Sequence, residues 1–444
     1  MRAYIVIDLG FGDAGKGLIT DFLVRQTRAG VVVRYNGGAQ AGHNVVAPDG
    51  RHHTFSQFGS GSFVPGVKTY LSKHMVVHPG ALLIEGDVLA NKGVSDAFSR
   101  LKINPQSLII TPYHQAANRI RELAHENGKH GSCGVGVGET VEDDLACHDD
   151  SIRAGDLSKP NLLQQKMDAI RTRKQKALSE LFGDALNSKS IAAEWQVFQQ
   201  DDLALRWMEP IHRIVELDLV EESNTLAEWS KTSDAMIFEG AQGVLLDAEA
   251  GFYPYNSWTD CSADNAMSLI QEFMPDCEKI KVGVSRCYSV RHGPGPLPTE
   301  THELDGIITE HNQNNPWQGS VRYGWFDHIL FDYALKAVNG VDMLAITHLD
   351  IINILNAWKI CQRYSSENNL ETRLLSFASL ALDQKEILTH QLMSTKTEYE
   401  TIKPTESDVV GAIEHAAGFS AALTARGPSS QDVTISKKGI FELH

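Results

Sequence analysis

The sequence predicts an α/β fold: a single large domain over residues 1–444, with a mainly parallel central sheet, a P-loop-like phosphate loop and helical insertions. Strands that are buried on both faces of a parallel sheet read as nearly continuous apolar runs. Such runs occur at residues 3–9, 31–35, 235–238, 280–287 and 343–347. Between roughly residues 80 and 230 the pattern becomes largely helical and rich in charge, which predicts a helical insertion.

The first apolar run leads directly into the glycine-rich loop Gly10-Phe-Gly-Asp-Ala-Gly-Lys-Gly17. A strand, such a loop and a helix start form the arrangement that cradles phosphates, and Gly15 and Lys16 fit the spacing of a Walker A loop. Gly17 stands where such loops carry the Ser or Thr that binds Mg²⁺. Asp13 lies inside the loop, where a carboxylate is unfavourable unless it holds a metal or moves a proton. The loop therefore predicts chemistry on a phosphate.

A second glycine-rich loop, Asn36-Gly-Gly-Ala-Gln-Ala-Gly-His-Asn44, follows the strand predicted at 31–35. Ligands of α/β sheets bind at the carboxyl ends of the parallel strands. A single glycine-rich turn can serve packing alone, but two of them after successive strands favour a ligand site. The segment 18–23 carries one apolar face at helical spacing, as a phosphate-binding helix requires.

The two loops resemble the signature loops of the adenylosuccinate synthetase family. The resemblance continues in order along nearly the whole chain, through Glu239-Gly-Ala-Gln-Gly-Val-Leu-Leu-Asp247, Tyr253-Pro-Tyr255, Tyr288-Ser-Val-Arg-His-Gly-Pro-Gly-Pro-Leu-Pro-Thr-Glu300, Gly324-Trp-Phe-Asp327, Thr347-His-Leu-Asp350 and Gly427-Pro428. It implies a carbon–nitrogen ligase that joins L-aspartate to C6 of IMP or a similar purine nucleoside monophosphate. GTP and Mg²⁺ are the implied co-substrate and cofactor, and a homodimer is the implied assembly.

The resemblance also implies which residues act on the substrates. A base that removes the N1 proton of the purine makes O6 nucleophilic toward the γ-phosphate, and Asp13 matches that base. His43 matches the residue that stabilises the transferring phosphoryl group, a task for which histidine is suited near neutral pH. Gln242 aligns with a third catalytic residue, which contacts the acceptor nucleotide. Mg²⁺ is expected between Asp13, phosphate oxygens and the Gly42 carbonyl.

Further matches outline a nucleotide site. Its expected phosphate-side residues are Gly12, Gly15, Lys16, Gly17, Gly42 and Asn44. Asp350 matches the carboxylate that reads guanine, since an acid can accept both N–H bonds of that base. His348 replaces the usual lysine of this motif, and Ala425-Arg-Gly-Pro428, which includes the candidate Gly427, replaces Ser-Thr-Gly-Pro. We predict GTP as the phosphoryl donor, with ATP as the open alternative.

The acceptor side departs further from the family. Its candidate residues are Gln40, Ser132, Cys133, Ser257, His292 and Arg322. The family's phosphate loop reads Gly131-Ser-Cys-Gly-Val-Gly136 here, and Cys147 falls near the place of an intersubunit arginine. The aspartate loop, residues 318–324, retains one arginine, and arginines are not replaced conservatively where they clamp carboxylates or phosphates. His292 takes the place of a small apolar residue and alters the base pocket.

Two alternatives stay open. Phage-type relatives condense aspartate with a guanine deoxynucleotide to give 2-aminoadenylosuccinate, so GMP or dGMP is the other candidate acceptor; those relatives usually replace the residue that matches Asp13. A nucleotide-binding regulator that has lost catalysis is the alternative from a different class. Because a regulator needs neither a base nor an acid, the presence of Asp13, Lys16 and His43 argues against it.

Composition narrows the function classes. The chain has 40 Lys and Arg against 56 Asp and Glu, a formal charge of −16, which disfavours nonspecific binding to nucleic acid or anionic membranes. The start of the sequence carries no signal-peptide pattern, and no apolar stretch is long enough to span a bilayer. The six cysteines form no CxxC pair. These features predict a cytoplasmic enzyme.

Overall fold

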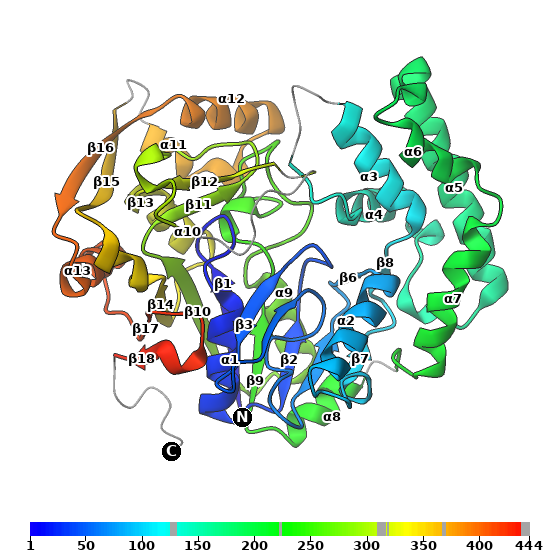
Figure 1. Cartoon of the computed structure of the whole chain (residues 1–444), viewed down its shortest axis with the longest axis horizontal. Helices are drawn as coiled ribbons and strands as arrows, with labels where there is room; N and C mark the ends of the chain where they lie inside the picture. Colours follow the sequence, from blue (N-terminus) through cyan, green and yellow to red (C-terminus); the bar gives the residue numbers. More distant parts are fainter. Residues whose placement is uncertain (125–130, 222–223, 309–316, 318, 366–369, 437–444) are drawn as a thin grey trace.

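The computed structural model describes residues 1–124, 131–221, 224–308, 317, 319–365 and 370–436. A nine-stranded sheet lies at its centre (Figure 1). In spatial order its strands are β18 (Val433–Ile435), β17 (Leu423–Ala425), β14 (Met343–Thr347), β10 (Glu278–Arg286), β1 (Arg2–Asp8), β9 (Ala235–Glu239), β2 (Val31–Arg34), β5 (Lys68–Leu71) and β7 (Leu101–Ile103). All neighbours are parallel except β17 and β18, which confirms the predicted mainly parallel sheet.

The five apolar runs of the sequence correspond to strands in this sheet, with ends that differ by at most two residues. Strand β9 inserts between β1 and β2, although it follows β2 by a long stretch of sequence. Its register places Phe238 beside Ile5 on one side and Val33 on the other. Residues of β1, β2 and β9 are almost fully buried, so the middle of the sheet is covered on both faces.

The helices of the described residues are α1 (Lys16–Thr27), α2 (Pro79–Asn91), α3 (Pro112–Ala124), α4 (Val137–Ala146), α5 (Pro160–Phe182), α6 (Ala192–Trp195), α7 (Leu203–Glu216), α8 (Thr225–Lys231), α9 (Asp264–Phe273), α10 (His328–Ala337), α11 (Leu370–Leu374), α12 (Leu382–Met393) and α13 (Glu406–Ala417). Helix α1 begins directly after Gly15, which has a positive φ of 92°, and its expected apolar face is buried. A left-handed residue at Arg28 ends it.

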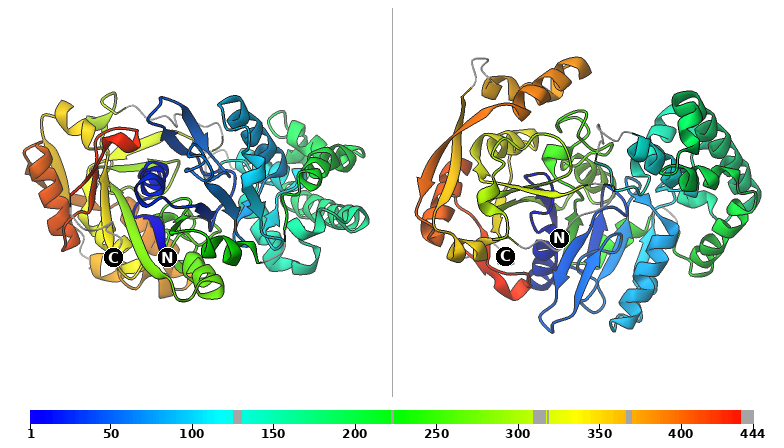
Figure 2. Two further views of the ribbon diagram at one scale, coloured as in Figure 1. Left: turned by 90° about the horizontal axis from the view of Figure 1, so that it is seen from below. Right: turned by 45° about the horizontal axis from the view of Figure 1, so that its top comes forward.

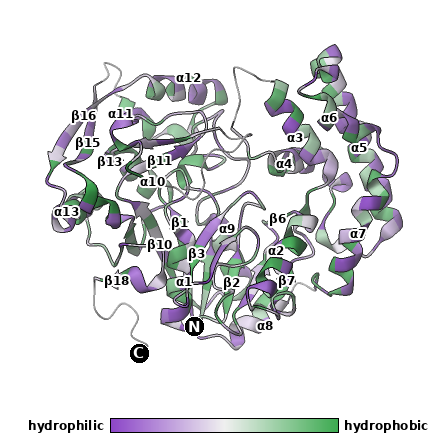
Figure 3. Cartoon of the chain, viewed as in Figure 1, coloured by the Kyte–Doolittle hydropathy of each residue, from purple (hydrophilic) through white to green (hydrophobic). Residues whose placement is uncertain are grey.

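Helices α3 to α7 gather at one end of the molecule in every view (Figures 1 and 2). They share a hydrophobic core, drawn from residues 45–219, that differs from the two cores on the faces of the central sheet. Their surfaces alternate between hydrophilic and hydrophobic residues (Figure 3), as expected for helices with one buried face. No helix in the described part of the chain is both long and apolar enough to cross a membrane.

Four smaller sheets, which the apolar runs do not predict, complete the fold. Three of them pair β3 (His43–Val46) with β4 (His52–Phe55), β6 (Val76–Val77) with β8 (Leu108–Ile109), and β11 (Ser289–His292) with β12 (Val321–Gly324). In the fourth, β15 (Trp358–Ser365) lies between β13 (Phe326–Asp327) and β16 (Lys396–Ile402) and pairs with both. Two of them matter for the site, because β3 begins with His43 and β11 ends with His292.

Candidate active site

Three loops lie together at the carboxyl edge of the central sheet, after β1, β9 and β2. The loop after β9 lies between the other two and contacts both. A methyl group added at Gly12 would lie 3.8 Å from the backbone of Gln242, and one added at Gly37 would lie 2.5 Å from Ala241 Cβ. The two glycine-rich loops of the sequence are therefore brought to one place, with Gln242 between them.

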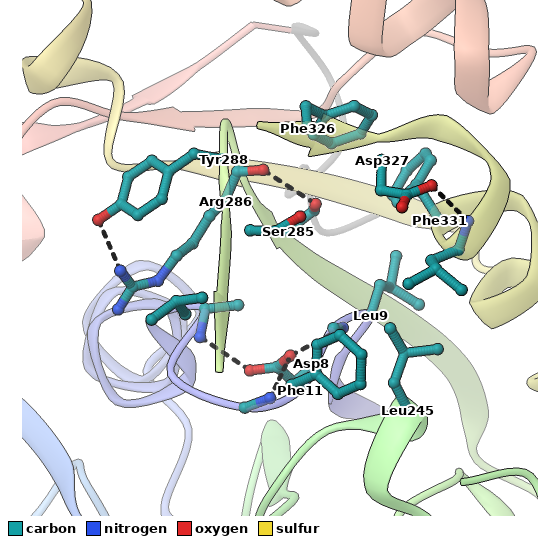
Figure 4. A pocket seen from close by; sticks show the side chains of 16 residues that line it. Asp8, Leu9, Phe11, Leu245, Ser285, Arg286, Tyr288, Phe326, Asp327 and Phe331 are labelled. Atoms are coloured by element: carbon teal, nitrogen blue, oxygen red, sulfur yellow. Dashed lines mark hydrogen bonds between the residues drawn. The ribbon is translucent and has the colours of Figure 1, made fainter. Parts of the chain in front are cut away.

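The phosphate loop folds around the carboxylate of Asp8, the last residue of β1. Oδ1 accepts hydrogen bonds from the backbone N–H groups of Gly10 at 2.9 Å and Gly12 at 3.3 Å. Oδ2 accepts from Ala14 N–H at 2.8 Å and from the ammonium of Lys16 at 2.9 Å. The Asp8 and Lys16 side chains are at most 3% exposed, so this ion pair is buried. Figure 4 shows the Asp8 carboxylate turned into the loop.

A cavity of about 50 Å³ lies behind this loop, between it and residues 285–290 and 326–331 (Figure 4). Ligand pockets usually measure about 300–1,000 Å³, so a nucleotide does not fit there. Asp327 lines this cavity, and burial raises the pKa of its carboxyl to about 6. The carboxylate accepts hydrogen bonds from the Leu330 N–H and the Tyr364 hydroxyl, which lower the pKa but do not offset the effect of burial.

Asp13 lies in the turn of the loop with a positive φ of 59°. Its Oδ2 is 2.7 Å from Nε2 of His292, and its backbone oxygen accepts from Nε of Arg286 at 2.5 Å. Oδ1 accepts no hydrogen bond from the residues described, and the side chain is 27% exposed. Burial alone raises the pKa of this carboxyl, but His292, Arg286 and Lys16 outweigh it and hold the pKa well below its usual range. Asp13 is therefore ionised.

His43 begins β3 and lies against the start of α1. A Cβ at Gly17 would lie 3.0 Å from both His43 Cβ and the Asn44 carbonyl oxygen, so the backbone of β3 fills the place of a larger residue. Nδ1 of His43 is 2.7 Å from Oε1 of Glu239, the last residue of β9. Burial lowers the pKa of His43, although Glu239 acts to raise it. The imidazole is thus neutral in the free protein, with Nδ1–H directed at Glu239.

Glu239 is itself fully buried and strongly anchored. It accepts hydrogen bonds from the backbone N–H and the hydroxyl of Ser60. Burial raises the pKa of its carboxyl, but His43 and Arg34 prevail and lower it to about 2. The ionised carboxylate fixes the orientation of the His43 ring and leaves Nε2 as the free end.

Four buried polar atoms of predicted site residues find no hydrogen-bond partner among the described residues. They are Oε1 of Gln40, Nε2 of His43, Oε1 of Gln242 and Nδ1 of His292. A buried polar atom without a partner costs about 1–3 kcal/mol, so such groups are usually satisfied. Their presence around the loops after β1, β2 and β9 indicates a place where a polar ligand completes the hydrogen bonding.

The loop Gly131–Gly136 lies next to the segment that follows β11, because a Cβ at Gly131 would lie 2.7 Å from Pro294 Cδ. Ser132 accepts from the Asn118 amide at 2.8 Å and donates its N–H to Glu122 at 3.1 Å. Burial raises the pKa of the Cys133 thiol to about 12, with a further contribution from the charge of Asp13. The loop thus lies within electrostatic range of Asp13.

Two acceptor-side candidates make contacts within the protein. The Arg322 guanidinium donates to the carbonyls of Gly293 and Gly295 at 2.9 and 2.8 Å and to the Glu300 carboxylate at 2.7 Å, and so supports the segment after His292. Ser257 bonds to the hydroxyl of Thr259 at 2.9 Å. Their roles toward a substrate stay predictions. Gln318 lies outside the described residues.

The candidate base-binding residues follow β14 and β17, which are neighbouring strands. His348 has a positive φ of 59°, and its Cε1 would lie 3.8 Å from a Cβ at Gly15. Asp350 is exposed on the short helix that follows. Gly427 packs against Asp432, while the neighbouring Arg426 pairs with Glu406. Asn44 accepts from the Thr54 hydroxyl at 2.5 Å. The assignments to the nucleotide stay predictions.

The donor set fits Mg²⁺. Among the described residues, no three His, Cys, Asp or Glu side chains gather as a metal site of their own. Mg²⁺ is commonly held by one or two carboxylates together with phosphate oxygens and water. The carboxylate of Asp13 and the Gly42 carbonyl, which directly precedes β3, supply oxygen donors of that kind.

Sequence reasoning gave no role to three charged residues of this site: Asp8, Glu239 and Arg286. Each is the last residue of a buried strand, β1, β9 or β10, and immediately precedes a site loop. A charged residue that ends an apolar run before a glycine-rich loop is the signal that could have identified Asp8 and Glu239.

Known proteins match this chain along nearly its whole length. The family model for adenylosuccinate synthetase matches residues 5–434. The adenylosuccinate synthetase of Neisseria meningitidis serogroup C is 30% identical over 440 residues, which cover 97% of this chain and 97% of that protein. The enzyme of Mycobacterium leprae is 31% identical over 444 residues, which cover 98% of each chain.

Two solved structures share the fold. Fully ligated adenylosuccinate synthetase from Plasmodium falciparum superposes with a TM-score of 0.74 at 20% identity and covers 98% of this chain and 100% of that one. The succinoaminodeoxyadenylate synthetase of cyanophage S-2L, bound to dGMP and dATP, gives a TM-score of 0.62 at 16% identity. The match covers 98% of this chain and 96% of that one. With its loops and its full-length match, the chain belongs to the adenylosuccinate synthetase family, a family of ligases.

Proposed function

We propose that this ligase joins L-aspartate to C6 of a purine nucleoside monophosphate of the IMP type, with GTP as the phosphoryl donor. Family membership supports the reaction class. The observation that carries the assignment is the presence, in two loops at one edge of the sheet, of an ionised Asp13 and of a buried His43 whose Nε2 has no partner in the described residues. A base and a phosphate-facing imidazole are the two groups that the chemistry needs.

In the proposed reaction, Oδ1 of Asp13 takes the N1 proton of the purine, and the electrons pass to O6. The O6 atom then attacks the γ-phosphorus, GDP leaves, and the phosphoryl group is bonded to O6. Nε2 of His43 hydrogen-bonds to the transferring group, whose negative charge favours protonation of the imidazole. The neutral amine of aspartate then attacks C6, the C6–O6 bond breaks, inorganic phosphate leaves with O6, and the new secondary amine releases a proton to solvent. The sum is GTP, acceptor and aspartate to GDP, phosphate and the succinyl-amino purine nucleotide.

The phosphates are proposed to lie on the loop that contains Lys16, with Gly12, Gly15 and Gly17 allowing close approach of the backbone. Asp13 and the Gly42 carbonyl would hold Mg²⁺, which supplies charge neutralisation for the transferring phosphoryl group. Asp350 is proposed to read guanine. A homodimer in the cytoplasm is the proposed state of the enzyme, to be checked by its mass in solution.

The test is a matrix of acceptors (IMP, GMP, dGMP) with L-aspartate and either GTP or ATP, followed by phosphate release and by mass spectrometry of the products. We expect the succinyl adduct of IMP with GTP. If only GMP or dGMP gave a product, the acceptor would be a 2-aminopurine nucleotide and not IMP. Binding of nucleotide with no turnover of any mixture would indicate a regulator. Asp13→Ala, correctly folded, is the control that abolishes turnover.

A further inference from the structure

His292 makes the closest contact to the side chain of the proposed base. Its Nε2 lies 2.7 Å from Oδ2 of Asp13, and its side chain is 13% exposed. It is the last residue of β11, whose pairing with β12 sets Val321 opposite it. Nδ1 is buried and has no partner among the described residues. Because an ionised carboxylate can only accept hydrogen bonds, Nε2 is the nitrogen that donates to Asp13.

The backbone that carries His292 is firmly held. Arg291 donates to the carbonyls of Pro294 at 3.0 Å and Tyr255 at 2.8 Å. Arg322 donates to the carbonyls of Gly293 and Gly295. Two guanidinium groups thus fix the residues on either side of His292, and the imidazole is offered to Asp13 from a rigid support.

Asp13, in contrast, sits in a loop turn close to two competing cations. Lys16 and Arg286 both lie near enough to act on its charge, and Arg286 already bonds to its backbone oxygen. A carboxylate without a fixed partner would turn toward these cations, because charge-assisted hydrogen bonds are the stronger ones. A base displaced by about 1 Å from its proton loses on the order of a hundredfold in rate.

We propose that His292 is a positioning residue for the reaction: by holding Oδ2 it keeps Asp13 away from Lys16 and Arg286 and leaves Oδ1 facing the acceptor. The inference rests on the proposed function and adds a residue to it. The resemblance implies a small apolar side chain at the position of His292. The role follows from the hydrogen bond at 2.7 Å and from the rigid support of β11.

The test compares His292→Leu, which keeps the bulk and removes the donor, with His292→Gln, whose amide N–H can reach Asp13 from a similar distance. The matched control is His302→Leu, which removes a histidine–aspartate contact of 2.8 Å at the surface, where the imidazole is 95% exposed. For each protein we would measure kcat with saturating substrates, the dissociation constant of GTP by calorimetry, the melting temperature, and isotope exchange in the phosphates of GTP without aspartate.

We expect His292→Leu to lower kcat and the isotope exchange by roughly a hundredfold, with GTP affinity and melting temperature close to those of the wild type. His292→Gln should recover at least tenfold of that loss, and His302→Leu should match the wild type. Should the leucine variant fail to fold, His292→Asn takes its place, since its shorter amide falls short of Asp13.

Retention of kcat within twofold in the non-donating variant overturns the proposal. A kcat of His292→Gln no higher than that of His292→Leu overturns the proposal too, because the loss would then come from the shape of the pocket and not from the missing hydrogen bond. If the wild type turns over none of the acceptors, the proposed function fails and this role with it, whereas an active wild type with an equally active leucine variant refutes the role of His292 alone.

Discussion

The buried carboxylate of Asp8 gives the most direct test of how the phosphate loop is built. In Asp8→Ala, the N–H groups of Gly10, Gly12 and Ala14 lose their acceptor, and the ammonium of Lys16 stays buried without its partner. In Asp8→Asn, a neutral oxygen remains for the loop N–H groups, but the charge opposite Lys16 is gone.

The expected magnitude follows from the burial of both groups, which are at most 3% exposed. Removing one partner of a buried ion pair costs about 3–5 kcal/mol, because the other charge is left uncompensated. The loss of the hydrogen bonds from the loop N–H groups adds to this cost. Water can replace part of the loss at Gly10 and Gly12, whose hydrogen bonds are only partly buried. We therefore expect Asp8→Ala to lower the free energy of unfolding by about 3–5 kcal/mol, a large part of the 5–15 kcal/mol typical of a native protein.

The assay is denaturant unfolding without nucleotide, with far-UV circular dichroism and tryptophan fluorescence followed together. The double variant Asp8→Ala/Lys16→Met should recover a substantial part of the loss, since it removes the stranded charge. Arg206→Ala is the control: its pair with Asp202 is 58% and 67% exposed, and exposed pairs contribute about 0–1 kcal/mol. A loss below about 1 kcal/mol in Asp8→Ala, or no recovery in the double variant, would refute the reasoning.

The proposed phosphate-facing imidazole, the proposed base-reading carboxylate and a buried acid each give a further expectation. His43→Asn should lower kcat roughly a hundredfold and GTP affinity, measured by calorimetry, far less; equal losses would indicate a structural role. Asp350→Asn should erode the kcat/KM preference for GTP over ATP, because a carboxylate can accept both N–H bonds of guanine and adenine offers neither; a wild type without preference would contradict it. Because burial raises the pKa of Asp327 from 3.8 to about 6, the folded state retains a proton that the unfolded state releases, and about 3 kcal/mol of stability is lost as pH rises through that window. Asp327→Asn should flatten this loss in melting curves at pH 4 to 8, and an unchanged slope would count against it.

The central strands could be predicted because burial on both faces leaves a plain apolar signal. The run at 343–347 coincides with β14, and β10 begins two residues before its predicted start. Their order could not be predicted, since nothing in the residues of β9 says that it pairs with both β1 and β2. Neighbours in a parallel sheet are chosen by packing between segments far apart in sequence.

The loops of the site could also be predicted, but not the directions of their side chains. A one-residue change in where a strand ends reverses the face on which its last side chain lies. The sequence alone therefore could not tell that Asp8 turns into its own loop or that Glu239 reaches His43. In the same way, the sequence predicts Arg322 as an acceptor-side residue but could not tell that its guanidinium contacts Glu300.

The position of β9 has a consequence for synthesis of the chain. Strands β1 and β2 flank β9, so their inner edges stay open until residues 235–239 exist. At about 5–20 residues per second, a ribosome takes roughly 10–40 s to make the stretch between β2 and β9. Residues 45–219 have a hydrophobic core of their own and can collapse during this interval. The candidate site, whose loops follow β1, β2 and β9, is thus completed only after β9 has been made.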